Sequence, residues 1–174
     1  MRAWPSPHLP VVPGEPISLR LHDVARDEVA PVEPADPARL YVCGVTPYDT
    51  THMGHAATYV TFDLVNRALR DGGRQVTYVQ NVTDVDDPLF ERADRDGVDW
   101  RDLGQDQIAL FLEDMTALGV IPPEHFMGVM ESMPQIIAAV QQLVARGVTY
   151  EVVEDGVRDT YLDLGAAGGL GELS

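Results

Sequence analysis

The sequence has little cysteine, few basic residues and no long apolar run. Its only cysteine, Cys43, excludes an internal disulfide bond, and a reducing cytoplasm is the natural setting for such a chain. No stretch approaches the roughly 18 uninterrupted apolar residues of a membrane span. The first seven residues lack the apolar segment of a secretory signal. We therefore expect a cytoplasmic protein with no membrane partner.

The shortage of basic residues also bears on partners. Twelve Lys and Arg stand against 28 Asp and Glu, which gives a net charge of −16 and a sequence pI of about 4.4. This balance opposes a broad phosphate-tracking surface, which needs clustered cations, and it predicts no nucleic-acid partner. It is compatible with a local phosphate site, because backbone N–H groups and one or two histidines can build one.

The apolar content and the distribution of proline indicate one folded domain with a proline-rich arm. The chain has 174 residues, of which 45% are hydrophobic, enough for a core. Eight of the 13 prolines lie in residues 1–37, so most of this arm should be extended coil. Within it, Ile17, Leu19 and Leu21 alternate with polar residues and predict one short strand.

Residues 38–80 carry a strand–helix–strand pattern. The apolar run Leu40–Cys43 predicts a buried strand, and the spacing of apolar residues predicts a helix over 54–71 that ends at Gly72. Val76–Val79 predicts a second strand. A βαβ unit of this length requires parallel strands and a right-handed crossover, so the fold class is α/β.

The rest of the chain predicts further elements around this unit. Ser132 and Gln135 resemble a capping box that starts a helix ending near Arg146. The other expected elements are helices at 87–95 and 104–118, a third strand at His125–Val129, and a small β pair at Val148–Val153 and Thr160–Leu164. We divide the chain into an arm (1–37), a domain built on the βαβ unit (38–147) and a last segment (148–174).

The segment between the first strand and the first helix carries the strongest chemical signal. Ligands of open α/β sheets bind at the carboxyl ends of strands, where helix N-termini offer unpaired N–H groups to phosphate. His52 and His55 bracket Gly54 there, and two imidazoles could donate to the oxygens of a phosphoryl group. The alternatives are an ordinary helix start with two exposed histidines, or a metal site, for which this spacing is a weak pattern.

Two further groups of residues reach the same edge. Cys43 closes the first strand; a lone cysteine is more often a small buried hydrophobe, and zinc would need further ligands. Asn81 and Thr83 follow the second strand and can present polar groups to the crevice. The alternative for this segment is a helix N-cap followed by first-turn acids at Asp86 and Asp87.

Three segments together resemble the cysteinyl-tRNA synthetase lineage of class I synthetases. They are residues 41–49, the signature His52–His55, which resembles the family's HIGH motif, and residues 78–87. One branch of that lineage charges tRNA, and the other comprises the cysteine–glucosaminyl-inositol ligases of mycothiol biosynthesis. The second branch is favoured by Thr46-Pro47, by the absence of arginine after His55, and by residues 11–14 and 88–93.

The resemblance implies a function and a set of site residues. It implies the N-terminal half of a class I Rossmann-like fold with parallel strands, and ATP-dependent activation of cysteine followed by transfer to the amine of glucosaminyl-inositol. It also implies that residues 38–147 are half of a Rossmann-like catalytic domain and that residues 148–174 are the start of a connective region. His52 and His55 would stabilise the phosphoryl transition state, and Cys43 would be one ligand of a zinc ion that binds the substrate thiolate. The substrate- and cofactor-binding residues by this resemblance are Cys43, Gly44, Val45, Thr46, Gly54, Thr58, Asn81, Val82 and Thr83. ATP would enter with Mg²⁺.

The family's chains run well past residue 174, and their remaining zinc ligands and KMSKS loop lie in that part. We therefore expect this chain to be an inactive N-terminal fragment of an enzyme that is monomeric at full length. Two other interpretations stay open at the sequence level: a fragment of a cysteinyl-tRNA synthetase, and a non-catalytic nucleotide-binding module.

Overall fold

The structure is a computed structural model that describes residues 1–11 and 13–168. The chain divides into two compact units, one comprising residues 1–21 and 30–131, the other residues 22–29 and 132–174. Among the described residues, no helix has both the length and the apolar character that crossing a bilayer requires. The division into arm, half-domain and connective region stays a prediction, and residues 169–174 of that last region lie outside the described residues.

The first unit is built on a three-stranded parallel sheet. Its strands are β3 (Ala38–Val42), β4 (Val76–Val82) and β5 (His125–Gly128), in the order β3-β4-β5. Leu40 pairs with Tyr78, and Val79 pairs with His125, both in parallel register. The predicted parallel α/β arrangement and the predicted third strand are confirmed. The carboxyl ends of all three strands consequently meet at one edge.

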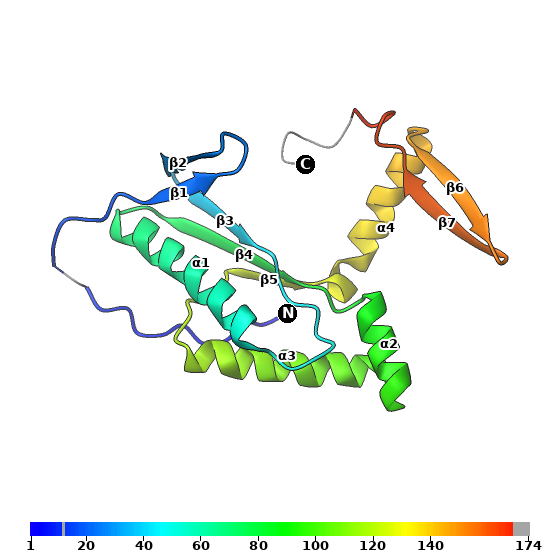
Figure 1. The fold of residues 1–174 in the computed structure, drawn as a ribbon, viewed down its shortest axis with the longest axis horizontal. Helices are drawn as coiled ribbons and strands as arrows, with labels where there is room; N and C mark the ends of the chain where they lie inside the picture. The colour runs from blue at the N-terminus through cyan, green and yellow to red at the C-terminus, as the bar shows by residue number, and fades with distance from the viewer. Residues whose placement is uncertain (12, 169–174) are drawn as a thin grey trace. The chain divides into compact units, whose positions relative to one another are not determined.

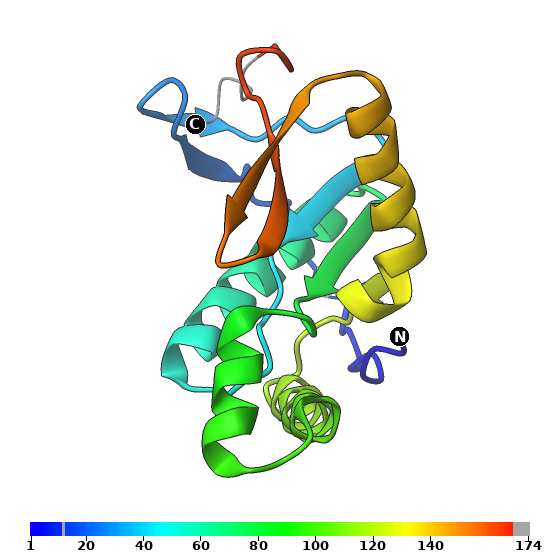
Figure 2. The ribbon, with the colours of Figure 1, turned by 90° about the vertical axis from the view of Figure 1, so that its right-hand side faces the viewer.

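Two helices cover one face of this sheet. They are α1 (Met53–Asp71), which crosses between β3 and β4, and α3 (Trp100–Ala117), which lies beside it (Figure 1; Figure 2 shows α3 nearly end-on). Alternate residues of the strands point toward the helices, as a strand's period of two requires. The resulting core contains Trp4, Val42, Val45, Tyr59, Tyr78, Val82, Phe111, Met115, Val120 and Phe126.

The N-terminal boundaries of α2 and α3 are set by aspartate side chains that cap them. α2 (Asp87–Asp96) begins after Asp86, whose carboxylate accepts from the Asp87 N–H, so the N-cap interpretation of this acidic segment is confirmed. α3 begins four residues before the predicted start at 104. Its N-cap is Asp99, which accepts from the Arg101 N–H at 2.8 Å. A side-chain cap of this kind fixes where a helix begins.

The N-terminal arm contributes to the core. The Trp4 ring is buried against Phe111 and Phe126, and its indole N–H donates to the Val120 carbonyl at 2.8 Å. The single strand predicted around residues 17–21 is displaced: β1 is Arg20–Asp23, and it pairs with β2 (Glu28–Pro31), which the sequence pattern did not predict.

The predicted start of the last helix at Ser132 is wrong. α4 spans Val129–Ala145 and contains Pro134 within it. The cap is non-local: the Asp84 carboxylate accepts from the Met130 N–H at 3.0 Å, while the Glu131 carboxylate accepts from the Gly128 N–H at 3.2 Å. Because Asp84 comes from the end of β4, local sequence could not show that the helix starts this early.

The second unit contains most of α4 and an antiparallel pair, β6 (Thr149–Glu154) and β7 (Val157–Leu162). Tyr150 pairs directly with Tyr161, and their rings stack with centroids 5.5 Å apart. Cross-strand aromatic pairs stabilise such hairpins. The predicted small β pair is thus confirmed.

Candidate functional site

The loop that joins β3 to α1, residues 43–52, is here called the site loop. Its start is tied to the end of β4 by the side chain of Asn81. The Asn81 Oδ1 accepts from the Gly44 N–H at 2.8 Å and from the Tyr41 hydroxyl at 3.0 Å, and its Nδ2 donates to Thr83 Oγ1 at 3.3 Å. Asn81 therefore bridges two strand ends, with its oxygen already committed to the protein.

The backbone at Gly44 passes too close to β4 for any side chain. A Cβ added there would lie 1.5 Å from the Asn81 carbonyl oxygen. Two further hydrogen bonds hold the same segments together: the Thr83 N–H donates to the Val45 carbonyl at 3.0 Å, and the Thr46 hydroxyl donates to the Asp86 carboxylate at 3.3 Å. Glycine at this position thus allows the two strand ends to meet.

Val45 and Val82, both predicted to bind a substrate or cofactor, direct their side chains into the core. Only 5% of Val45 and none of Val82 is exposed. Contact with a ligand at these positions would have to come from the backbone.

The signature histidines form a capping box at the start of α1. His52 is the N-cap; its Nδ1 accepts from the Gly54 N–H at 3.0 Å. The His55 Nδ1 accepts in turn from the His52 N–H at 3.2 Å, and the two rings stack with centroids 4.0 Å apart. Gly54 leaves open the space beside the His52 ring, and the Thr58 hydroxyl donates to the Gly54 carbonyl at 3.0 Å.

These contacts fix the protonation pattern of the pair. An Nδ1 that accepts a hydrogen bond carries no proton, so each neutral ring must carry its proton on Nε2. Burial lowers the pKa of His55 below its ordinary value, and the neighbouring His52 lowers it further. The loop therefore presents Nε2–H donors next to the N-terminal amides of α1, which is an arrangement suited to phosphate oxygens.

The cap should be sensitive to acid. Since folding lowers the pKa of His55, its contribution to stability is present above the ordinary histidine value of 6.5 and is lost as pH falls through the folded pKa. Protonated Nδ1 can no longer accept from the His52 N–H. We expect the unfolding temperature of the wild type to fall relative to that of His55→Asn, which cannot be protonated, as pH is lowered from 7.5 to 5. Thermal unfolding at each pH measures this, and parallel curves for the two proteins would contradict it.

Cys43 is exposed at the carboxyl end of β3, and the Tyr59 hydroxyl donates to its carbonyl at 3.4 Å. The exposed thiol is chemically suited to be one zinc ligand. Within residues 1–11 and 13–168, however, no three His, Cys, Asp or Glu side chains gather into a possible metal site. The described residues by themselves therefore do not complete a zinc site.

The structure brings the predicted residues together in two groups. Cys43–Thr46 meet Asn81–Thr83 across the two strand ends, while His52, Gly54, His55 and Thr58 lie at the N-cap and in the first two turns of α1. Tyr59 connects the groups through Cys43. The sequence analysis assigned Tyr59 no role at the site, and it did not identify the contacts of Tyr41 or Asp86.

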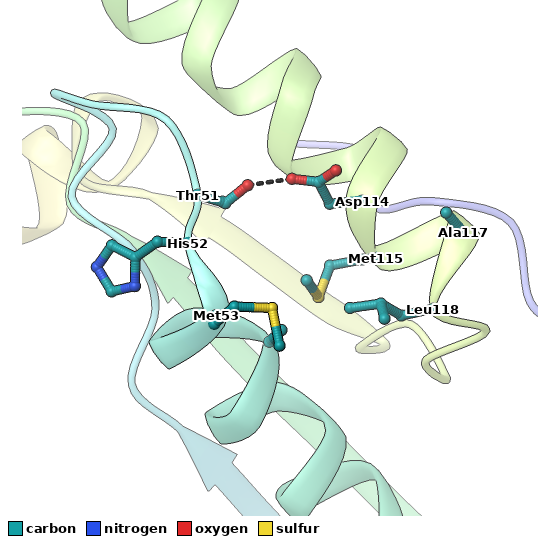
Figure 3. Close-up of a pocket in the computed structure, with 8 residues that line it drawn as sticks. Thr51, His52, Met53, Asp114, Met115, Ala117 and Leu118 are labelled. Carbon is teal, nitrogen blue, oxygen red and sulfur yellow. Dashed lines mark hydrogen bonds between the residues drawn. The ribbon is translucent and has the colours of Figure 1, made fainter.

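A pocket of about 390 Å³ lies between the start of α1 and the end of α3. Figure 3 shows the Thr51 side chain on the pocket side of the site loop, where its hydroxyl donates to the Asp114 carboxylate, and the His52 ring on the other side. The pocket is lined by Thr51, His52, Met53, Ala56, Asp114, Met115, Ala117 and Leu118. Of the predicted site residues, only His52 is among them.

Comparisons with known proteins show which family the chain resembles. The chain is 58% identical over its whole length to the L-cysteine:1D-myo-inositol 2-amino-2-deoxy-α-D-glucopyranoside ligase of Geodermatophilus obscurus, of which it covers 41%. It is 59% identical over 92% of its length to the ligase of the same name from Gordonia bronchialis, of which it covers 39%. The chain thus resembles the N-terminal part of these ligases and spans about two fifths of their length.

The fold is shared with solved class I enzymes. A Mycobacterium tuberculosis methionyl-tRNA synthetase in complex with methionyl-adenylate matches 70% of the chain with a TM-score of 0.58 at 18% identity, covering 28% of that protein. At this identity the likeness shows the fold alone. The family described as "tRNA synthetases class I (C) catalytic domain" matches residues 30–174. The chain therefore belongs to the class I (C) tRNA synthetase catalytic-domain family.

Proposed function

We propose that the chain is the N-terminal part of an ATP-dependent ligase that joins cysteine to the amine of glucosaminyl-inositol, forming the amide precursor of mycothiol. The observation that carries this proposal is the His52–His55 capping box, which leaves Nε2–H donors at the helix N-terminus that the site loop joins to the exposed Cys43. The names of the relatives support the choice of substrates.

The reaction takes place in two steps. A carboxylate oxygen of cysteine attacks the α-phosphorus of ATP, the bond to pyrophosphate breaks, and cysteinyl-adenylate forms. The amine nitrogen of the sugar then attacks the activated carbonyl carbon, the bond to AMP breaks, and the amine gives up a proton. His52 and His55 serve the first step, since donors aimed at a phosphoryl group stabilise its charge most in the transition state.

The other predicted residues take different roles. We expect the hydroxyl oxygens of Thr46 and Thr58 and backbone groups of Gly44, Val45 and Val82 to contact the adenylate. Asn81 holds Gly44 in place, and its amide group and Thr83 border the same strand ends. Cys43 would provide one thiolate ligand to zinc, with the remaining ligands from beyond this chain, and a soft zinc–thiolate bond would favour cysteine over serine.

The described site has little positive charge of its own for ATP and its Mg²⁺-bound pyrophosphate. The sequence contains no lysine. Arg92, which contacts the site loop through Asp49, is also paired with Asp96. We infer that the part of the enzyme beyond residue 174 supplies further cations and closes the site against water, without which electrostatic stabilisation weakens.

Residues 1–174 alone should therefore be inactive. We expect cysteine-dependent ATP–pyrophosphate exchange at least roughly 10²-fold below that of the full-length enzyme, the magnitude of losing a single transition-state donor. Bound zinc should be well below one equivalent. The experiment purifies both proteins, checks folding by circular dichroism, and measures metal content and exchange. Exchange near the full-length rate, or stoichiometric zinc in residues 1–174, would show that the site is misplaced.

Product analysis tests the acceptor. Full-length enzyme with ATP, cysteine and glucosaminyl-inositol should release AMP and form the amide, whereas added tRNA should not be charged. Charging of tRNA would instead establish the tRNA synthetase interpretation, which the family description keeps as the second candidate. We further expect the enzyme to be a cytoplasmic monomer with no nucleic-acid partner, consistent with the net charge of −16.

A further inference from the structure

We propose that Asp114 of α3 is a positioning residue, which holds Thr51 and thereby aims the signature histidines. This inference rests on the proposed function of the His52–His55 pair. Thr51 directly precedes the N-cap His52, and its hydroxyl donates to the Asp114 carboxylate, 63 residues away in the sequence. Neither residue is assigned a role by the signature itself.

The backbone geometry explains how a contact at Thr51 controls His52. His52 is extended, with φ −133° and ψ 175°. In extended chain, successive side chains point to opposite sides. Figure 3 shows this arrangement: Thr51 points toward α3, and the His52 ring points away from it. Holding Thr51 against α3 therefore presents His52 on the opposite side of the loop, where it stacks on His55.

The anchor on α3 is rigid. Asp114 is followed by Met115, which is 1% exposed, and Phe111 one turn earlier is also 1% exposed. Both belong to the core that α3 shares with the sheet and with Tyr59 of α1. Asp114 thus stands on a helix whose position relative to the sheet is fixed by close packing.

A second contact holds the loop from another helix. The Asp49 carboxylate lies 3.3 Å from the Arg92 guanidinium of α2, and Arg92 is itself bound to Asp96 on the same helix. The site loop is consequently held at residue 49 by α2 and at residue 51 by α3. Asp49 is 59% exposed, so this ion pair is a weak restraint, as exposed pairs usually are.

The hydroxyl–carboxylate bond between Thr51 and Asp114 is exposed and contributes modestly to folding, although the charge makes it stronger than a neutral one. Its effect on rate can be much larger, because a misplacement of about 1 Å at a reacting group costs roughly 10²-fold. The proposal therefore predicts an effect on kcat with little effect on stability or on substrate binding.

The test compares Thr51→Val, Thr51→Ser and Asp114→Ala in the full-length enzyme. Valine keeps the shape of threonine and lacks the hydroxyl, so it should lower kcat for cysteine-dependent pyrophosphate exchange by roughly 10- to 10²-fold. KM for cysteine should stay within about twofold. Serine keeps the hydroxyl and should restore most of the rate. Glu113→Ala, which removes the adjacent carboxylate on the same helix, is the matched control and should leave exchange unchanged.

Two further measurements separate positioning from a general structural effect. The double variant Thr51→Val/Asp114→Ala should lose no more than either single variant, because both remove one interaction. Histidine NMR titration should show the His55 pKa moving back toward its ordinary value in Thr51→Val as the pair loosens. Should Asp114→Ala fail to fold, Asp114→Leu, which has a similar shape and no acceptor, replaces it as the single variant and in the double variant.

Wild-type kcat in Thr51→Val, additive losses in the double variant, or an unchanged His55 titration would each overturn the proposal. A wild-type enzyme without cysteine-dependent exchange would instead refute the proposed function. In that case the His55 titration still tests whether Asp114 and Thr51 position the histidine pair, because it needs no activity.

Discussion

A Gly44→Ala variant should lose the site and much of the stability of the first unit. The added Cβ would lie 1.5 Å from the Asn81 carbonyl oxygen and 2.4 Å from its carbon. These are backbone atoms of a central strand, so no side-chain rotation can relieve the overlap. The ends of β3 and β4 must separate, which breaks the hydrogen bonds from Gly44 to Asn81 and from Thr83 to Val45.

We expect a loss of more than about 4 kcal/mol in unfolding free energy, the range reached only by a few severe mechanisms. Pyrophosphate exchange should fall below detection. Denaturant unfolding and exchange assays on the full-length protein measure both effects.

Gly104→Ala is the matched control. Gly104 is buried in α3, and its added Cβ would meet Leu89 Cδ2 at 3.5 Å, an ordinary contact. Alanine there should stabilise the helix by up to about 1 kcal/mol, because glycine loses more backbone freedom on folding. If Gly44→Ala proved as stable and active as Gly104→Ala, the close approach of the two strand ends would not exist as described.

The sequence predicted elements whose signals are local. Three such signals are the apolar run of β3, the spacing of apolar residues along α1 and the glycine that ends α1. Each depends only on residues close together in the sequence. The parallel sheet then followed from the order strand, helix, strand. The prediction of where α4 starts was wrong because the signal that sets its start is not local. Its cap comes from Asp84, 46 residues away, whereas the misleading Ser132 had a locally convincing pattern.

The residues of the site were likewise predictable only where the signal is local. The position of the histidine pair at the start of α1 was predictable because the pair lies within four consecutive residues that follow a strand; the capping box that the two rings form was not predicted. The role of Asn81 was not, since its partners Gly44 and Tyr41 depend on how β3 aligns with β4. Asp114 was beyond prediction too, because nothing in α3's own sequence indicates which exposed acid faces the site loop.

The second large effect is expected for His55→Ala in the full-length enzyme. The Nε2–H of His55 is available as a donor because its Nδ1 accepts from the His52 N–H. Removing one donor of this kind costs about 3–4 kcal/mol in the transition state, or roughly 10²–10³ in rate. We expect pyrophosphate exchange to fall by that factor while cysteine binding changes little, because such donors act mainly on the transition state.

His55 also caps α1, so the alanine variant removes two functions at once, and two further substitutions separate them. In His55→Asn, the side-chain oxygen can take the place of Nδ1 and accept from the His52 N–H, but no donor reaches the position of Nε2. This variant should be as stable as the wild type and as slow as His55→Ala.

In His55→Gln, the longer amide places an N–H near the position of Nε2, and it should recover part of the rate. His8→Ala, in the N-terminal arm, is the control for histidine loss in general. Exchange within about twofold of wild type in His55→Asn would mean that the ring is needed only as a cap, and that the transferring phosphoryl group is stabilised elsewhere.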